Sequence, residues 1–268
     1  MGMTTDGPDL SFSRAEIERY SRNILLPEIG AIGQARLRAA SVLVIGVGGL
    51  GAPVALYLAA AGIGRIGLVD DDTVDLSNLQ RQILFDTAAV GRPKVEAAAA
   101  RLRALNPEIV VETHRIRAEA AMLDALVGAY DLVCDGSDNF ATRQAVSDAT
   151  VRRGRTLVSG AVQRFEGQIS TFRPQKGGPC YRCLYPDATE DDAPRCGDAG
   201  ILGSVTGVIG AMMATEAVKE QLDIGESLQG RLLCWDALAA QFRSFALARD
   251  PHCPGCGPGC GSDCDDRS

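Results

Sequence analysis

A glycine-rich turn between an apolar strand and an apolar helix constrains this chain more than any other feature. Residues 41–45 (SVLVI) are short, apolar and β-branched, as in a buried parallel strand. GVGGLG follows at 46–51, and a helix is predicted over 49–61. Glycines here let the backbone approach phosphates, and the helix start supplies free N–H groups. The turn predicts a nucleotide site, although a tight turn that simply requires glycine, or a dehydrogenase, would also explain it.

Predicted strands and helices alternate along much of the chain. Apolar runs predict further strands at 65–69, 108–116, 131–134 and 156–159. Helical patterns lie between them at 92–106, 118–128 and 139–153. Strands that alternate with helices form mostly parallel sheets with helices on both faces. The sequence therefore predicts a Rossmann-like α/β fold, preceded by a helical segment at 13–39.

The pattern changes after the last of these strands. Residues 168–172 alternate in polarity, which predicts an exposed antiparallel strand, and two more strands are expected at 231–235 and 241–247. Residues 180–200 are rich in turn residues, and 203–222 has a helical pattern. An antiparallel C-terminal region is therefore expected beside the parallel sheet.

Charge and hydropathy exclude two kinds of partner. The 27 basic residues are outnumbered by 34 acidic ones, and no basic run resembles a nucleic-acid site. Residues 39–64 carry no charge over a length that could span a bilayer. Their glycines and Pro53 fit a buried strand, turn and helix better, so no membrane association is expected. Residues 1–20 lack the pattern of a signal peptide, which predicts a cytoplasmic protein.

The nine cysteines are unevenly placed. In a reducing compartment, clustered cysteines indicate metal binding or catalysis. Two C-x-x-C pairs supply four thiols suited to a tetrahedral structural zinc site: Cys180, Cys183, Cys253 and Cys256. A redox pair or plain buried thiols are the alternative, and Cys260 and Cys264 could compete for the metal. Cys134 and Cys234 lie in apolar strand patterns and are expected in the core.

Polar residues gather where the predicted parallel strands end. Asp70 ends the second strand, where a carboxylate can accept hydrogen bonds from ribose hydroxyls. Asp138 and Asn139 follow the strand that ends near Cys134. Because ligands of such sheets bind at the carboxyl ends of the strands, these groups should share one edge with Arg81 and Lys94. The set suits magnesium, phosphates and ribose, whereas any one of the cations alone could be a surface charge.

This combination resembles the MoeB/ThiF family, bacterial relatives of ubiquitin-activating enzymes, over roughly 13–256. The motifs that carry the resemblance are RYSRNILLPEIG (19–30), GVGGLG (46–51), DTVDLSNLQRQ (72–82), GRPKVE (91–96), SDN (137–139), SGAVQRFEGQI (159–169) and CYRCL (180–184). The resemblance implies that magnesium–ATP is bound by the turn and the polar edge. The implied residues are Gly46, Gly48, Gly49, Gly51, Asp70, Asp72, Ser77, Asn78, Gln80, Arg81, Lys94, Asp138 and Asn139.

The resemblance also implies an activity. Family members adenylate the C-terminal glycine of a ubiquitin-like sulfur carrier that ends in Gly-Gly, such as MoaD or ThiS. A carboxylate is ionised at pH 7, so its attack on phosphorus requires alignment and charge neutralisation rather than a base. Accordingly, neither His114 nor His252 is placed like a catalytic base. Asp138 would hold the magnesium, with Arg81 and Lys94 on the phosphates.

Two further roles are implied across subunits and partners. Arg22 would reach the phosphates of a neighbouring subunit, so a homodimer is expected. Cys196 lies where some family members use a cysteine to link covalently to the carrier. The residues after Cys256 leave no room for a fused rhodanese domain, which predicts a separate sulfur donor, either a desulfurase or a rhodanese.

With neither an internal repeat nor a linker, 1–268 is interpreted as a single domain in four parts. These are N-terminal helices (1–40), an ATP-binding region (41–160), a carrier-binding and zinc region (161–256) and a flexible tail (257–268). Besides the dehydrogenase already mentioned, three functions stay open at this point. The carrier could be MoaD-like and serve molybdopterin, the service could be ThiF-like for thiamine, thiouridine or a specialised metabolite, or the chain could be a non-catalytic nucleotide-binding scaffold.

Overall fold

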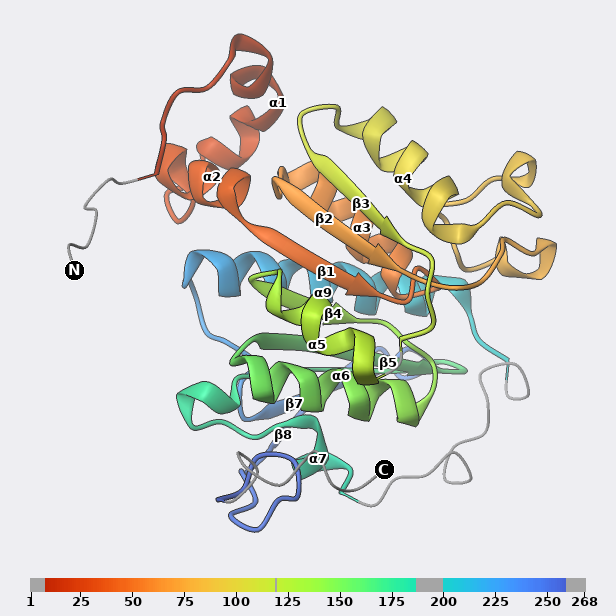
Figure 1. Cartoon of the computed structure of the whole chain (residues 1–268), viewed down its shortest axis with the longest axis vertical. Coiled ribbons are helices and arrows are strands. Elements are labelled where there is room, and N and C mark those ends of the chain that lie inside the picture. Colours follow the sequence, from red (N-terminus) through yellow and green to blue (C-terminus); the bar gives the residue numbers. More distant parts are fainter. Residues whose placement is uncertain (1–7, 119, 187–199, 259–268) are drawn as a thin grey trace.

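A single eight-stranded sheet organises the computed structural model, which describes residues 8–118, 120–186 and 200–258 (Figure 1). The strand order is β3-β2-β1-β4-β5-β6-β7-β8, parallel from β3 to β5 and antiparallel from β5 to β8. The strands are β1 Ser41–Ile45, β2 Arg65–Val69, β3 Val110–His114, β4 Leu132–Asp135, β5 Thr156–Gln163, β6 Glu166–Phe172, β7 Arg231–Asp236 and β8 Gln241–Ala246. The predicted α/β class, with an antiparallel C-terminal region, is confirmed.

Helices cover both faces of the sheet (Figure 1). The α-helices are α1 Arg14–Ile24, α2 Gly30–Ala39, α3 Gly51–Ala61, α4 Lys94–Leu105, α5 Ala120–Gly128, α6 Phe140–Arg153, α7 Tyr181–Leu184 and α9 Gly203–Leu222. On one face, Leu58 of α3, Leu102 of α4 and Ile209 of α9 belong to the larger core. Leu123 of α5 and Val146 of α6 belong to a second core on the opposite face. Burial on both faces explains the continuous apolar character of β1.

The N-terminal segment predicted to be helical over 13–39 forms two helices, α1 and α2. A capping box between Ser13 and Glu16 begins α1. Pro27 interrupts the pattern, because proline lacks an amide hydrogen and disfavours helical geometry in the residue before it. Gly30 then adopts a left-handed φ of 59° as α2 begins.

The hairpin of β5 and β6 is longer and more buried than the sequence suggested. β5 continues past residue 159, and its pairing with β6 runs from Leu157 to Gln163. Ile169 to Phe172 are buried, so the expectation of an exposed strand is wrong. The reason is α9: a Cβ placed on Gly167 would lie 2.3 Å from Ile209 of that helix. The alternation of polar and apolar residues in β6 therefore belongs to a strand that α9 covers, and not to an exposed strand.

The other element boundaries differ from the predictions by a few residues, α7 lies in the stretch 180–200 expected to be rich in turns, and short 3-10 turns lie outside the predicted strands and helices. These turns are Leu76–Asn78, Thr87–Ala89 and Pro174–Lys176. Among the described residues, no helix combines the length and apolar character needed to cross a membrane. Most of the predicted flexible tail, 259–268, lies outside the described residues.

Candidate functional site

A cavity of about 480 Å³ opens at the carboxyl ends of β1, β2 and β4. The chain connections run in opposite directions from β1 and β4, which is where open α/β sheets bind ligands. Ten of the residues predicted to bind the nucleotide line this cavity. They are Gly46, Gly48, Gly49, Asp70, Asp72, Asn78, Arg81, Lys94, Asp138 and Asn139. The structure therefore gathers residues that are far apart in the sequence around one space.

The other four predicted residues lie outside this lining. A Cβ on Gly51 would lie 1.8 Å from the carbonyl oxygen of Gly46, so this glycine is needed for the turn itself. The Ser77 hydroxyl donates to Asp75 at 2.6 Å, and Gln80 is exposed. Arg22 is exposed on the last turn of α1. Their roles toward a nucleotide stay predictions.

The backbone of the glycine-rich turn lines the cavity, and local contacts fix its conformation. Gly46 has a left-handed φ of 76°, and a Cβ there would lie 3.2 Å from the backbone of Gly136. The Val47 amide donates to Oδ2 of Asp70 at 2.8 Å. Asp70 thus fixes the turn in addition to lining the cavity. Glycines that bare their backbone at a helix start make a cradle suited to phosphates.

Lys94 brings a buried positive charge to the cavity. Its Nζ lies 2.7 Å from Oδ2 of Asp72 and 3.9 Å from Oδ1 of Asp70. Burial raises the pKa of Asp70, and the charge of Lys94 opposes this shift. Carboxylate oxygens of Asp70, Asp71 and Asp72 lie within 4.8 Å of one another. Oxygen donors of this kind suit a hard cation such as magnesium.

Several lining residues were not singled out from the sequence. They include Gln82, Arg117, Arg143 and Thr206. Gln82 is buried, and its Oε1 has no hydrogen-bond partner among the described residues. A buried polar atom without a partner indicates a site completed by a ligand. Arg143 could have been found from its distance in sequence to Asp138 and Asn139, because it lies on the first turn of α6, directly after this pair.

A second hollow of about 420 Å³ adjoins the first. It lies over β5 to β8 and includes Gln168, Tyr185 and Phe245. The residues that line both hollows are Asp138, Asn139, Arg143 and Val162. Cys234 is half-buried and lines this groove, so its predicted core position is wrong: β7 lies near the edge of the sheet and is only partly covered.

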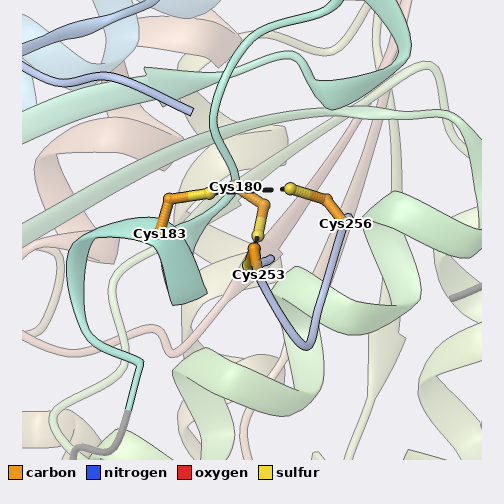
Figure 2. A group of neighbouring side chains, drawn as sticks. All are labelled: Cys180, Cys183, Cys253 and Cys256. Carbon is orange, nitrogen blue, oxygen red and sulfur yellow. Dashed lines mark hydrogen bonds between the residues drawn. The ribbon is translucent and has the colours of Figure 1, made fainter. Parts of the chain in front are cut away.

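Four cysteines form the cluster that the sequence predicted (Figure 2). Cys180 immediately precedes α7 and Cys183 lies within it, whereas Cys253 and Cys256 lie in the C-terminal loop, and all four thiols are directed toward one another. The sulfur atoms of Cys180 and Cys253 are 3.5 Å apart, and those of Cys183 and Cys256 are 3.6 Å apart. Four thiols at such spacing fit tetrahedral zinc, with no position left open for catalysis.

The surroundings of the cluster favour a structural role. Burial raises the pKa of the Cys180 and Cys256 thiols, the latter to about 11, so these groups resist ionisation without a cation. Arg182, between the first two cysteines, makes two 2.8 Å hydrogen bonds to Asp148 of α6. The cluster therefore joins α7 and the C-terminal loop to the main fold.

A model of the ThiF family matches residues 20–255. The chain belongs to the ThiF family. It is 47% identical over 253 residues to a Thermus thermophilus protein named sulfur carrier protein adenylyltransferase, covering 92% of this chain and 93% of that one. It is 46% identical over 251 residues to the SAMP-activating enzyme E1 of Haloferax volcanii, covering 93% of this chain and 92% of that one.

The fold of this ThiF family member is similar to that of MccB from E. coli, in its crystal structure with ATP. The TM-score is 0.79 at 27% identity, over 89% of this chain and 74% of that one.

Three cysteines considered from the sequence fall in parts of this ThiF family chain that the structure does not describe. They are Cys196, Cys260 and Cys264. The expected covalent role of Cys196, and competition of the other two for metal, stay predictions. The zinc ligands implied by the two C-x-x-C pairs are all among the described residues.

Proposed function

We propose that this protein adenylates the C-terminal glycine of a ubiquitin-like sulfur carrier that ends in Gly-Gly, at the expense of ATP. The observation that supports this most is the junction of two hollows at Asp138, Asn139 and Arg143. One hollow carries a phosphate cradle, and the other is a groove over the antiparallel strands. An extended tail in the groove would present its terminal carboxylate to the nucleotide. The names of the relatives in Thermus thermophilus and Haloferax volcanii agree with this activity.

The proposed reaction needs charge stabilisation and no general base. A carboxylate oxygen of the terminal glycine attacks the α-phosphorus of ATP. The bond from that phosphorus to the bridging oxygen breaks, and pyrophosphate leaves with the electron pair. Arg81 and Lys94 would neutralise the phosphates, while Arg143 spans the two hollows where the carboxylate meets them. His114, the last residue of β3, does not line either hollow.

Magnesium would neutralise phosphate charge when bound, and we propose Asp138 as its protein ligand. Asp138 is exposed on the rim that the two hollows share. The carboxylates of Asp70, Asp71 and Asp72 add further oxygen donors on the opposite side of the glycine-rich turn. This donor chemistry fits a small hard cation.

The finer parts of the proposal concern assembly and pathway. Residues 41–160 would bind ATP and 161–256 the carrier, within a single domain. Zinc would occupy the four-cysteine cluster, and Arg22 would act across a homodimer.

A MoaD-like carrier in molybdopterin biosynthesis is proposed first, with thiamine, thiouridine or specialised-metabolite carriers as the alternative. A desulfurase or rhodanese would supply sulfur, and the protein would act in the cytoplasm, where clustered cysteines serve metal binding rather than disulfides.

Isotope exchange between pyrophosphate and ATP tests the proposed function. Exchange should appear only when a candidate carrier with an intact C-terminal glycine is added, and the same carrier without that glycine is the matched control. Equal exchange with free amino acids, or none with any candidate carrier, would refute the proposal. ATP binding without exchange would instead support a non-catalytic scaffold.

A further inference from the structure

The backbone of Ser137, the residue before Asp138, is hydrogen-bonded at both its amide and its carbonyl group. The amide of Ser137 donates to Oδ1 of Asp135 at 3.0 Å. The carbonyl oxygen of Ser137 accepts from Arg143 twice, from Nε at 3.1 Å and from Nη2 at 2.7 Å. Both polar groups of the Ser137 backbone are therefore committed to side chains. We call this arrangement the Ser137 clamp.

Asp135 is an unusual residue to find at this position. It ends β4, it is 0% exposed, and it lines neither hollow. Burial raises the pKa of this carboxyl, while the charge of Arg143 opposes the shift. Burying a carboxylate costs free energy unless hydrogen bonds and opposite charges compensate, and here the Ser137 amide and the charge of Arg143 do so. The proposed reaction gives Asp135 no direct part, because it does not reach the cavity.

The clamp ends where the proposed magnesium ligand begins. Asp138 follows Ser137 directly and is exposed on the shared rim, where its Oδ1 lies 3.5 Å from Nδ2 of Asn139, a long and weak contact. On the other side, Asn139 caps α6 by accepting from the Thr142 amide at 2.8 Å. Asp138 thus stands between two fixed points, the Ser137 clamp and the α6 cap.

We propose that Asp135 is a positioning residue, which orients Asp138 toward the magnesium–ATP complex through the Ser137 clamp. This inference rests on the proposed function only for the identity of the metal ligand. Groups that orient a metal ligand from behind change metal affinity by about 10- to 100-fold when they are removed. Asp135 acts through its acceptor oxygen, so the loss of the acceptor should matter more than the loss of charge.

The test is the magnesium dependence of ATP binding, measured by calorimetry without any carrier. In Asp135→Ala, the magnesium concentration that half-saturates ATP binding should rise at least about tenfold. Binding of ATP without magnesium should stay within about twofold of wild type. Asp135→Asn keeps an oxygen that can accept from the Ser137 amide, and should stay within about threefold of the wild-type magnesium requirement.

Glu216→Ala is the matched control. Glu216 is a buried carboxylate on α9 that accepts from the Leu228 amide at 3.1 Å, away from both hollows. This variant should lose thermal stability and keep the wild-type magnesium requirement. An unchanged requirement in Asp135→Ala, or an equal rise in Glu216→Ala, would overturn the proposal.

Hydrogen exchange keeps the inference testable if Asp135→Ala does not fold. In the wild-type protein without nucleotide, the Ser137 amide should be protected, because Asp135 accepts its hydrogen. If the Ser137 amide exchanged as fast as an amide in an unstructured loop, its hydrogen bond to Asp135 would be absent and the inference would be overturned. ATP binding independent of magnesium in wild type would also overturn the inference, whereas magnesium-dependent binding without carrier-dependent exchange would refute only the proposed function.

Discussion

The ammonium group of Lys94 lies 2.7 Å from the carboxylate of Asp72, at the wall of the cavity proposed to hold the nucleotide. Lys94 is 6% exposed, so its charge is held in place before any ligand binds. Charge fixed in advance is what a transition state with developing negative charge requires. The same burial makes Lys94 important for the neighbouring Asp70, whose pKa it lowers against the effect of burial.

Lys94→Met is expected to lower carrier-dependent exchange by about 10²-fold or more, because it removes this fixed charge while keeping the side-chain volume. Arg81→Ala should have an effect of similar size, and Asp138→Ala should abolish exchange. Lys219→Met is the control, since Lys219 pairs with Glu216 on α9 away from the cavity. A change in exchange in Lys219→Met comparable to that in Lys94→Met would contradict the assignment, as would near-normal exchange in Asp138→Ala.

The sequence predicted the parallel half of the fold well because its signals are local. An apolar run such as 41–45 and the glycines that follow it specify a buried strand and its turn without reference to the rest of the chain. The β5–β6 hairpin was less predictable, since the burial of Ile169 depends on α9, which arrives much later in the sequence. Tertiary contacts of that kind leave no local signal.

A second prediction concerns the four-cysteine cluster. About one zinc per chain is expected, and Cys183→Ser should lose metal and lower the melting temperature, because the binding free energy of a structural metal contributes to folding. Metal analysis and thermal denaturation of the same samples provide the measurement. The Cys234→Ser variant should still bind about one zinc per chain, because Cys234 lies outside the cluster. Loss of zinc after truncation behind Gly257 would instead place Cys260 or Cys264 in the site.

The third prediction uses the two histidines of the chain. Burial lowers the pKa of His114 from its usual 6.5, an effect that Glu112 opposes, so the folded state favours neutral imidazole. The unfolded chain therefore binds more protons as the pH falls through about 6.5, and stability should decline over that range. His114→Gln should flatten the decline between pH 7 and pH 5.5.

His252→Gln serves as the comparison for this measurement, because His252 is exposed. Chemical denaturation at several pH values measures the free energy of unfolding of each variant. If His114→Gln shows the same loss of stability with falling pH as wild type, His114 does not cause it.

In the candidate site too, the sequence predicted the residues that belong to local motifs and missed one whose role depends on the folded structure. The glycines of the turn and the Asp138–Asn139 pair were found because each belongs to a contiguous motif. The role of Asp135 was not found, because a buried aspartate at a strand end has no sequence signature. Only the structure shows that its acceptor faces the Ser137 amide. Residues that position others act through geometry, which composition and spacing do not encode.

The last prediction separates adenylation from sulfur transfer. Adenylation requires phosphate binding and alignment of a carboxylate, and neither step uses a thiol. Cys196→Ala should therefore keep carrier-dependent pyrophosphate exchange. Intact-mass spectrometry, with and without reductant, would reveal a covalent conjugate with the carrier, and Cys234→Ala controls for the thiol of the groove. A conjugate lost only in Cys196→Ala would favour the ThiF-like route, since a thiolate can attack the activated glycine. Loss of exchange itself in Cys196→Ala would refute the independence of adenylation from this cysteine.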